Sequence, residues 1–161
     1  MKKLFSILFV LVFCFFAFSG CSYTKDKLNL GKNDKPDAPP DLIVKYEEQT
    51  IKAWRGTYAW EINGNFIMSD SVGPLDIKDR LPWLQLSNET KLTFDFEFKP
   101  TSIKVERCSI DAIDYNDLIE IPITKSSIKI DKGGYIYFIT ASWNDETKNY
   151  NGTADYAFII K

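Results

Sequence analysis

The sequence contains no histidine among its 161 residues. Serine–histidine–aspartate and cysteine–histidine catalytic arrangements are therefore excluded, because each uses an imidazole as its base. Zinc, copper and non-haem iron sites with histidine ligands are excluded for the same reason. The glycines are scattered over turn-like segments, so a phosphate-binding loop between a strand and a helix is also lacking. We predict no cofactor and no metal.

Cysteine is rare, and only Cys21 and Cys108 lie outside the apolar run at the start of the chain. Cys108 falls in the stretch IKVERCSI, where strand alternation places it among apolar positions. A small buried hydrophobic side chain is the expected role of such a thiol. Cys21 instead follows the small pair Ser19-Gly20 and precedes a lysine-rich segment.

The first 20 residues have the layout of a secretory signal. Lys2 and Lys3 precede an uncharged run over 4–18, shorter than the roughly 20 apolar residues of a membrane-spanning helix. The residues before Cys21 resemble the lipobox of bacterial lipoproteins, although Phe18 stands where leucine is more usual. The resemblance implies that Cys21 is acylated, for example with palmitate, after residues 1–20 are removed. Ordinary signal cleavage near Gly20, with Cys21 left free, is the alternative.

The charge of the mature chain argues against nucleic acid as a partner. The 20 basic residues less Lys2 and Lys3 leave 18 against 22 acidic residues, which gives a formal charge of −4. Binding to phosphate backbones needs clustered lysine and arginine. Nucleic acid is therefore not an expected partner.

The lipobox-like segment instead predicts a protein held at the outer face of the cytoplasmic membrane by the lipid on Cys21.

The composition divides the chain into three predicted segments. Residues 1–20 form the predicted signal peptide, and the polar, proline-containing residues 21–41 form the lipidated cysteine and a flexible tether. Residues 42–161 are long enough for one domain with a hydrophobic core.

This domain shows strand patterns throughout. KLTFDFEF alternates, with Leu92, Phe94 and Phe96 on one face, and GYIYFITASW is apolar on both faces. Asn63-Gly64 is a strong two-residue hairpin signal, and Asn151-Gly152 also reads as a turn. A segment around PLDIKDRLPW has room for one short helical turn. We predict an all-β, immunoglobulin-like antiparallel β-sandwich.

Four aromatic and glycine-containing stretches span nearly the whole predicted domain, namely GTYAW (56–60), FDFEFKPTSIKV (94–105), GYIYFITASW and GTADYAF. Together they are similar to an uncharacterised extracellular domain of lipoproteins from Gram-positive bacteria. These are aromatic and glycine landmarks of a β-fold. The resemblance implies an architecture and brings no catalytic residue.

Residue types leave a few reactive arrangements open. Paired carboxylates are sufficient for glycoside hydrolysis, and Lys125 lies beside Ser126 and Ser127 as a serine–lysine catalyst would require. The acidic stretch 111–117 offers oxygen ligands for calcium, although its spacing departs from the helix–loop–helix calcium signature. Each arrangement has a simpler interpretation. The carboxylates are solvated strand positions, the lysine and the two serines form a turn, and 111–117 is a solvated acidic loop. We predict that the protein is not an enzyme.

Aromatic residues are the remaining candidates for binding. Trp60 and Trp143 are expected in the core of the sandwich. Trp83 follows Pro82 in a loop and is the best candidate for exposure, with Arg80 close enough to stack on it. Candidate ligand-binding residues are therefore Trp83, Arg80, Trp54 and Tyr58.

The leading functional hypothesis is a non-enzymatic, membrane-anchored binding or accessory lipoprotein that engages another envelope protein. A cell-wall carbohydrate-binding module that uses exposed aromatic residues is the alternative. A small glycoside hydrolase with paired carboxylates is the third hypothesis.

Overall fold

The computed structural model describes residues 37–87, 91–131 and 133–161. The predicted signal peptide, Cys21 and the tether up to residue 36 lie outside the described residues. The strands are β1 Leu42–Tyr46, β2 Gln49–Lys52, β3 Trp54–Ile62, β4 Asn65–Ser69, β5 Trp83–Leu84, β6 Lys91–Phe96, β7 Ser102–Ser109, β8 Ile119–Glu120, β9 Ile123–Thr124, β10 Ser127–Lys129, β11 Tyr135–Trp143 and β12 Tyr150–Ile160. A 3₁₀ segment, η1, spans Pro74–Arg80 and is interrupted at Ile77, so it holds more than the single turn expected.

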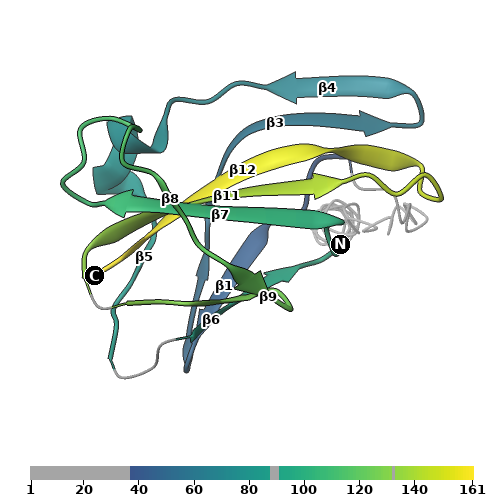
Figure 1. Ribbon diagram of the computed structural model, residues 1–161. Coiled ribbons are helices and arrows are strands. Elements are labelled where there is room, and N and C mark those ends of the chain that lie inside the picture. Colours follow the sequence, from purple (N-terminus) through teal and green to yellow (C-terminus); the bar gives the residue numbers. More distant parts are fainter. Residues whose placement is uncertain (1–36, 88–90, 132) are drawn as a thin grey trace, which may run out of the picture. The chain divides into compact units, whose positions relative to one another are not determined.

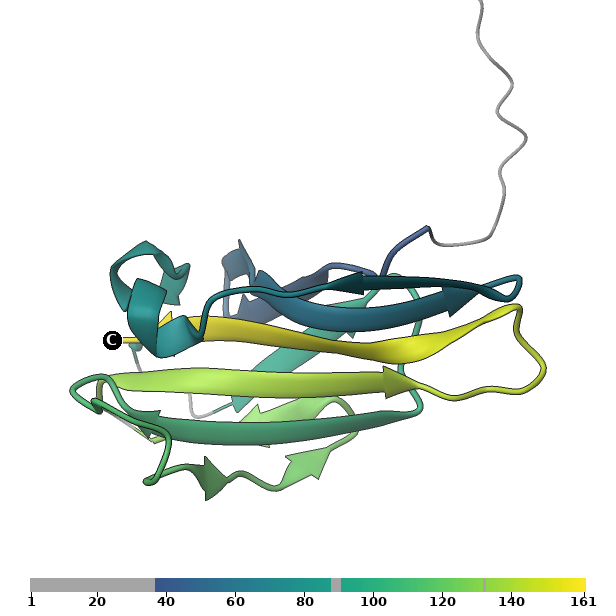
Figure 2. The same ribbon diagram turned by 90° about the horizontal axis from the view of Figure 1, so that it is seen from above.

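Two sheets pack together, as the sequence predicts for a β-sandwich (Figures 1 and 2). The smaller sheet has the strand order β2-β1-β6-β10-β9, and the larger has the order β4-β3-β12-β11-β7-β8. Neighbouring strands along both orders are antiparallel, whereas β5 pairs in parallel with the end of β12. The all-β sandwich is confirmed, and its immunoglobulin-like assignment stays a prediction.

The main core lies between the two sheets and follows the predicted alternation. Leu92 and Phe94 of β6 are buried, while Asp95 between Phe94 and Phe96 is exposed. β11 is central in the larger sheet and contributes buried residues to both of its faces. Trp60 and Trp143 are buried edge to face, with ring centroids 5.4 Å apart. Both tryptophans are therefore core residues, as predicted.

One predicted turn is confirmed and another is wrong. Asn63 and Gly64 have φ of 51° and 79° and join β3 to β4 in the conformation that favours tight hairpins. Asn151-Gly152 is not a turn, because both residues lie inside β12 and pair with β3. Gly152 is needed there for close approach, since a Cβ atom would overlap the carbonyl oxygen of Ala59.

The described end of the predicted tether contacts the domain. Pro39 and Pro40 are buried. The Arg55 guanidinium donates a hydrogen bond to the Pro39 carbonyl, and the Tyr156 hydroxyl donates one to the Pro40 carbonyl. Both bonds attach the chain before β1 to strands of the larger sheet.

A second, smaller core lies on the outer face of the larger sheet. It contains Cys108, Ile136, Ala157 and Ile159 of the sheet together with Leu81, which follows η1. The segment η1 and the loop after β7 lie at the same end of the sheet and cover this face (Figure 1). Cys108 is buried as predicted, and burial raises the pKa of its thiol, so it is neutral at physiological pH.

Candidate functional site

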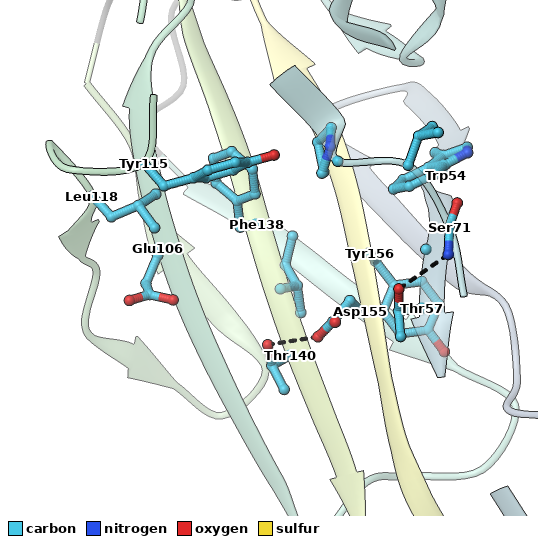
Figure 3. Close-up of a pocket in the computed structure, with 15 residues that line it drawn as sticks. Trp54, Thr57, Ser71, Glu106, Tyr115, Leu118, Phe138, Thr140, Asp155 and Tyr156 are labelled. Atoms are coloured by element: carbon cyan, nitrogen blue, oxygen red, sulfur yellow. Dashed lines mark hydrogen bonds between the residues drawn. The ribbon is translucent and has the colours of Figure 1, made fainter. Parts of the chain in front are cut away.

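A groove of about 260 Å³ opens on the outer face of the larger sheet, beside the second core. Its floor comes from β11 and β12, which contribute Phe138, Thr140 and Asp155. Tyr115 and Leu118 form one wall, whereas Trp54 and the segment around Ser71 form the other (Figure 3). The complete lining is Trp54, Gly56, Thr57, Ser71, Val72, Gly73, Pro74, Glu106, Tyr115, Leu118, Phe138, Ile139, Thr140, Asp155 and Tyr156.

Tyr115 is held by contacts to two different parts of the fold. Its ring meets that of Phe138 edge to face, with centroids 5.7 Å apart and planes at 71°. Its hydroxyl accepts a 3.4 Å hydrogen bond from the backbone N–H of Leu75 in η1. The loop after β7 is thereby tied to η1 across one end of the groove.

Two glycines make room for the aromatic walls. A Cβ atom at Gly56 would lie 2.9 Å from Cζ3 of Trp54, and one at Gly73 would overlap the Tyr115 hydroxyl. Real Cβ atoms are not found so close to their neighbours, so a side chain at either position would displace the adjacent ring. The positions of Trp54 and Tyr115 therefore depend on these two glycines.

The polar atoms of the groove are hydroxyls and carboxylates. Thr140 Oγ1 donates to Asp155 Oδ1 at 2.8 Å, and Thr57 Oγ1 accepts from the backbone N–H of Ser71 at 3.2 Å (Figure 3). The Glu106 carboxylate pairs with Lys104 Nζ at 2.7 Å. This hydrogen bond raises the pKa of Lys104. The lining given above carries no lysine or arginine, so its charge is acidic.

The structure does not bring the four predicted ligand-binding residues together. Trp54 lines the groove, but Tyr58 packs against the main core and has the Arg55 guanidinium 5.6 Å from its ring centroid. Trp83 is 51% exposed, as expected, and lies in a separate depression. Lys161 Nζ lies over its ring, 5.0 Å from the centroid, and Arg80 is exposed at the end of η1.

Tyr115 was not a sequence-based candidate, although it lies within the acidic stretch considered for calcium. Asp114 in that stretch accepts hydrogen bonds from the backbone and side-chain nitrogens of Asn116, at 3.0 and 2.9 Å. Among the described residues, no group of three or more histidine, cysteine or acidic side chains is arranged to hold a metal ion. The loop contributes the Tyr115 side chain to one wall of the groove. The sequence feature that could have indicated this role is the presence of a tyrosine within an otherwise acidic stretch.

Lys125 and Ser126 form the turn between β9 and β10, as the simpler interpretation of TKSSIK predicts. Their φ values are 48° and 61°, which is the left-handed conformation of a tight hairpin. Ser127 is buried, and its Oγ lies 3.3 Å from Thr93 Oγ1 on β6. The three residues therefore belong to a hairpin that forms one edge of the smaller sheet.

The edge strand β4 is a second candidate surface. Within the described chain its one partner strand is β3, and it forms the upper edge of the larger sheet in Figure 1. Phe66 is 62% exposed and Met68 64% exposed, and both side chains lie on the outer face of the sheet beside Glu61 and Ala59. Contiguous exposed apolar side chains of this kind mark interaction surfaces.

No family model, curated protein or solved structure matches this chain. The resemblance to lipoprotein domains of Gram-positive bacteria therefore remains a prediction from the sequence. In the described part of the chain, no helix is long and apolar enough to cross a membrane.

Proposed function

We propose that this protein is a non-enzymatic binding or accessory lipoprotein. It is anchored through Cys21 at the outer face of the cytoplasmic membrane and engages another envelope protein. The lipobox-like segment and the predicted tether support the location. The observation that carries the binding function is the exposed, apolar edge of β4.

An edge strand presents unpaired backbone N–H and C=O groups, which bind an extended segment of another protein by adding a strand. The other edges of the two sheets are less suited to this. β8 and β9 have two residues each, and β2 ends at the charged Lys52. β4 has five uncharged residues with large apolar side chains at its centre. It is therefore the edge best fitted to a protein partner.

Replacing Met68 with lysine tests this proposal. Because Met68 is largely exposed, the variant should keep its stability within about 0.5 kcal/mol of the parent. A charge at the centre of the edge opposes strand addition, so the yield of cross-linked partner in intact cells should fall at least about ten-fold. Quantitative mass spectrometry of cross-linked products from cells measures the yield.

The matched control is Ile119→Lys, because Ile119 is 59% exposed on the short edge strand β8. This variant should retain the partner. Equal yields from the parent and the Met68→Lys variant would refute β4 as the contact.

Recognition of cell-wall carbohydrate is a second candidate function. It is favoured by aromatic side chains that are accessible to a ligand, namely Trp83 in its depression and the walls of the groove. Tryptophan and tyrosine offer an apolar ring together with a polar group, which suits a ligand with both kinds of surface.

A further inference from the structure

We infer that the groove on the outer face of the larger sheet binds one or two rings of an uncharged saccharide, with Trp54 and Tyr115 as its walls. The inference deepens the second candidate function and assigns it to a specific site. It is separate from the β4 contact, because the partner strand would add at the edge of β4, whereas no residue of β4 lines the groove.

The size of the groove fits a small ligand. Its volume of about 260 Å³ is just below the roughly 300 Å³ at which pockets for drug-sized molecules begin. Thr140 and Asp155 lie at the end of the groove away from Trp54 and Tyr115 (Figure 3). One or two saccharide rings therefore match the available space.

The walls and the floor match the two surfaces of a sugar. Its C–H faces pack on aromatic rings, and the rings of Trp54 and Tyr115 border the groove from opposite sides (Figure 3). Its hydroxyls donate to carboxylates, and the Asp155 carboxylate accepts a hydrogen bond from Thr140, whereas a carboxylate has room for about four. The floor thus offers acceptors between two apolar walls.

The charge of the lining selects against acidic ligands. Two carboxylates, those of Asp155 and Glu106, border the groove, and its lining carries no cation to balance an acidic sugar or a phosphate. Glu106 is already paired with Lys104, which reduces the attraction for a free cation. The lining therefore favours neither an anion nor a free cation, and an uncharged, hydroxyl-rich ligand fits it better than either.

The groove is also formed in advance. Tyr115 is fixed by Leu75 and Phe138, and Thr140 orients Asp155. Side chains that are already ordered lose little conformational freedom when a ligand binds, which preserves affinity. A substitution at Gly73 tests this ordered arrangement. Its φ of −66° and ψ of 144° suit alanine, but a methyl group there would overlap the Tyr115 hydroxyl.

The test is calorimetric titration of the full chain, purified in a detergent without a sugar head group. The neutral probes are chitotriose, cellotriose and maltotriose, and trigalacturonic acid and choline are the charged ones. We expect at least one neutral probe to bind with a dissociation constant of about 1 mM or tighter. Trigalacturonic acid should bind at least about ten-fold more weakly. Failure of all three neutral probes, or binding of choline alone, would overturn the inference.

Substitutions then locate the site. Trp54→Ala should weaken binding at least about ten-fold, whereas Trp83→Ala and Met68→Lys should leave it unchanged. If Trp83→Ala abolishes binding and Trp54→Ala does not, the groove is refuted while carbohydrate recognition itself survives. The Met68→Lys control keeps this result separate from the protein-partner proposal.

A pair of variants tests the position of the Tyr115 ring without relying on a large truncation. Gly73→Ala should weaken binding in the parent, because the methyl group displaces the hydroxyl. In a Tyr115→Phe background the same change should have little effect. Cζ of the ring would be 3.5 Å from the new methyl group, an ordinary contact distance, and the exposed Asp76 side chain, with Oδ2 3.1 Å away, can rotate to relieve its contact. Equal losses in the two backgrounds would contradict the role assigned to Tyr115.

Discussion

Replacing Gly152 with alanine is expected to prevent stable folding of the domain. Gly152 has φ of +149° and pairs with Trp60, in the strand pair that joins β12 to β3. An added Cβ atom would overlap the Ala59 carbonyl oxygen and lie 2.8 Å from Cε3 of Trp60. Neither atom has freedom to move, because one belongs to the paired backbone and the other to a fully buried ring. The free energy of unfolding should therefore fall by more than about 4 kcal/mol.

Urea unfolding followed by tryptophan fluorescence and circular dichroism measures this loss, and accumulation of insoluble protein would be its extreme form. Gly64→Ala is the matched control, because Gly64 also has a positive φ, +79°, but no neighbouring atom within 4 Å of an added Cβ. Only the backbone cost of about 1–2 kcal/mol applies there. Similar losses for both variants would show that close approach to β3 is not what Gly152 provides.

The second large effect concerns the anchor. Cys21→Ala should abolish incorporation of labelled fatty acid and leave the protein released or with its signal uncleaved. Each buried methylene of an acyl chain contributes about 0.8 kcal/mol to membrane affinity, so loss of every chain removes stable attachment. Metabolic labelling and cell fractionation measure both results.

Cys108→Ala is the control for the anchor, because Cys108 is buried in the second core and has no access to a lipid-transferring enzyme. This variant should keep its label and its membrane fraction. Unchanged labelling of the Cys21→Ala protein would refute lipidation at Cys21.

The sequence was sufficient to predict those parts of the fold that depend on local alternation. The period of two in β6 and β12 places Phe94 and Phe158 in the core because successive side chains of a strand point to opposite faces. The Asn63-Gly64 turn was predictable because both residues tolerate a positive φ. Trp60 and Trp143 were expected in the core for another reason, since a tryptophan commonly fills the centre of a sandwich.

Features that depend on contacts between distant segments were not predictable in this way. Gly152 resembles a turn residue, and its requirement arises from a strand some 90 positions earlier in the chain. The groove joins Trp54, Tyr115 and Asp155, which no single periodicity relates. A register shift in the pairing of β3 with β12, between Ala154 and Tyr156, also breaks the simple alternation near Trp54 and Tyr58.

The apolar edge of β4 shows a different limit of sequence analysis. The Asn63-Gly64 hairpin signal predicts that the residues after it form a strand, but it does not reveal that this strand ends a sheet. Phe66 and Met68 lie on the outer face of the sheet and are exposed because little of the described chain packs over that face at β4. Both this exposure and the strand order were needed to recognise the apolar edge.

The most direct test of the proposed function is a sedimentation experiment with residues 22–161, which lack Cys21, the predicted site of lipidation. This shortened chain is incubated with membranes and, separately, with purified cell-wall sacculi from the same organism. We predict that membranes retain the parent, that protease treatment of the membranes abolishes retention, and that the Met68→Lys variant stays in solution. Retention that survives protease treatment, or an absence of retention on membranes, would contradict engagement of an envelope protein through β4.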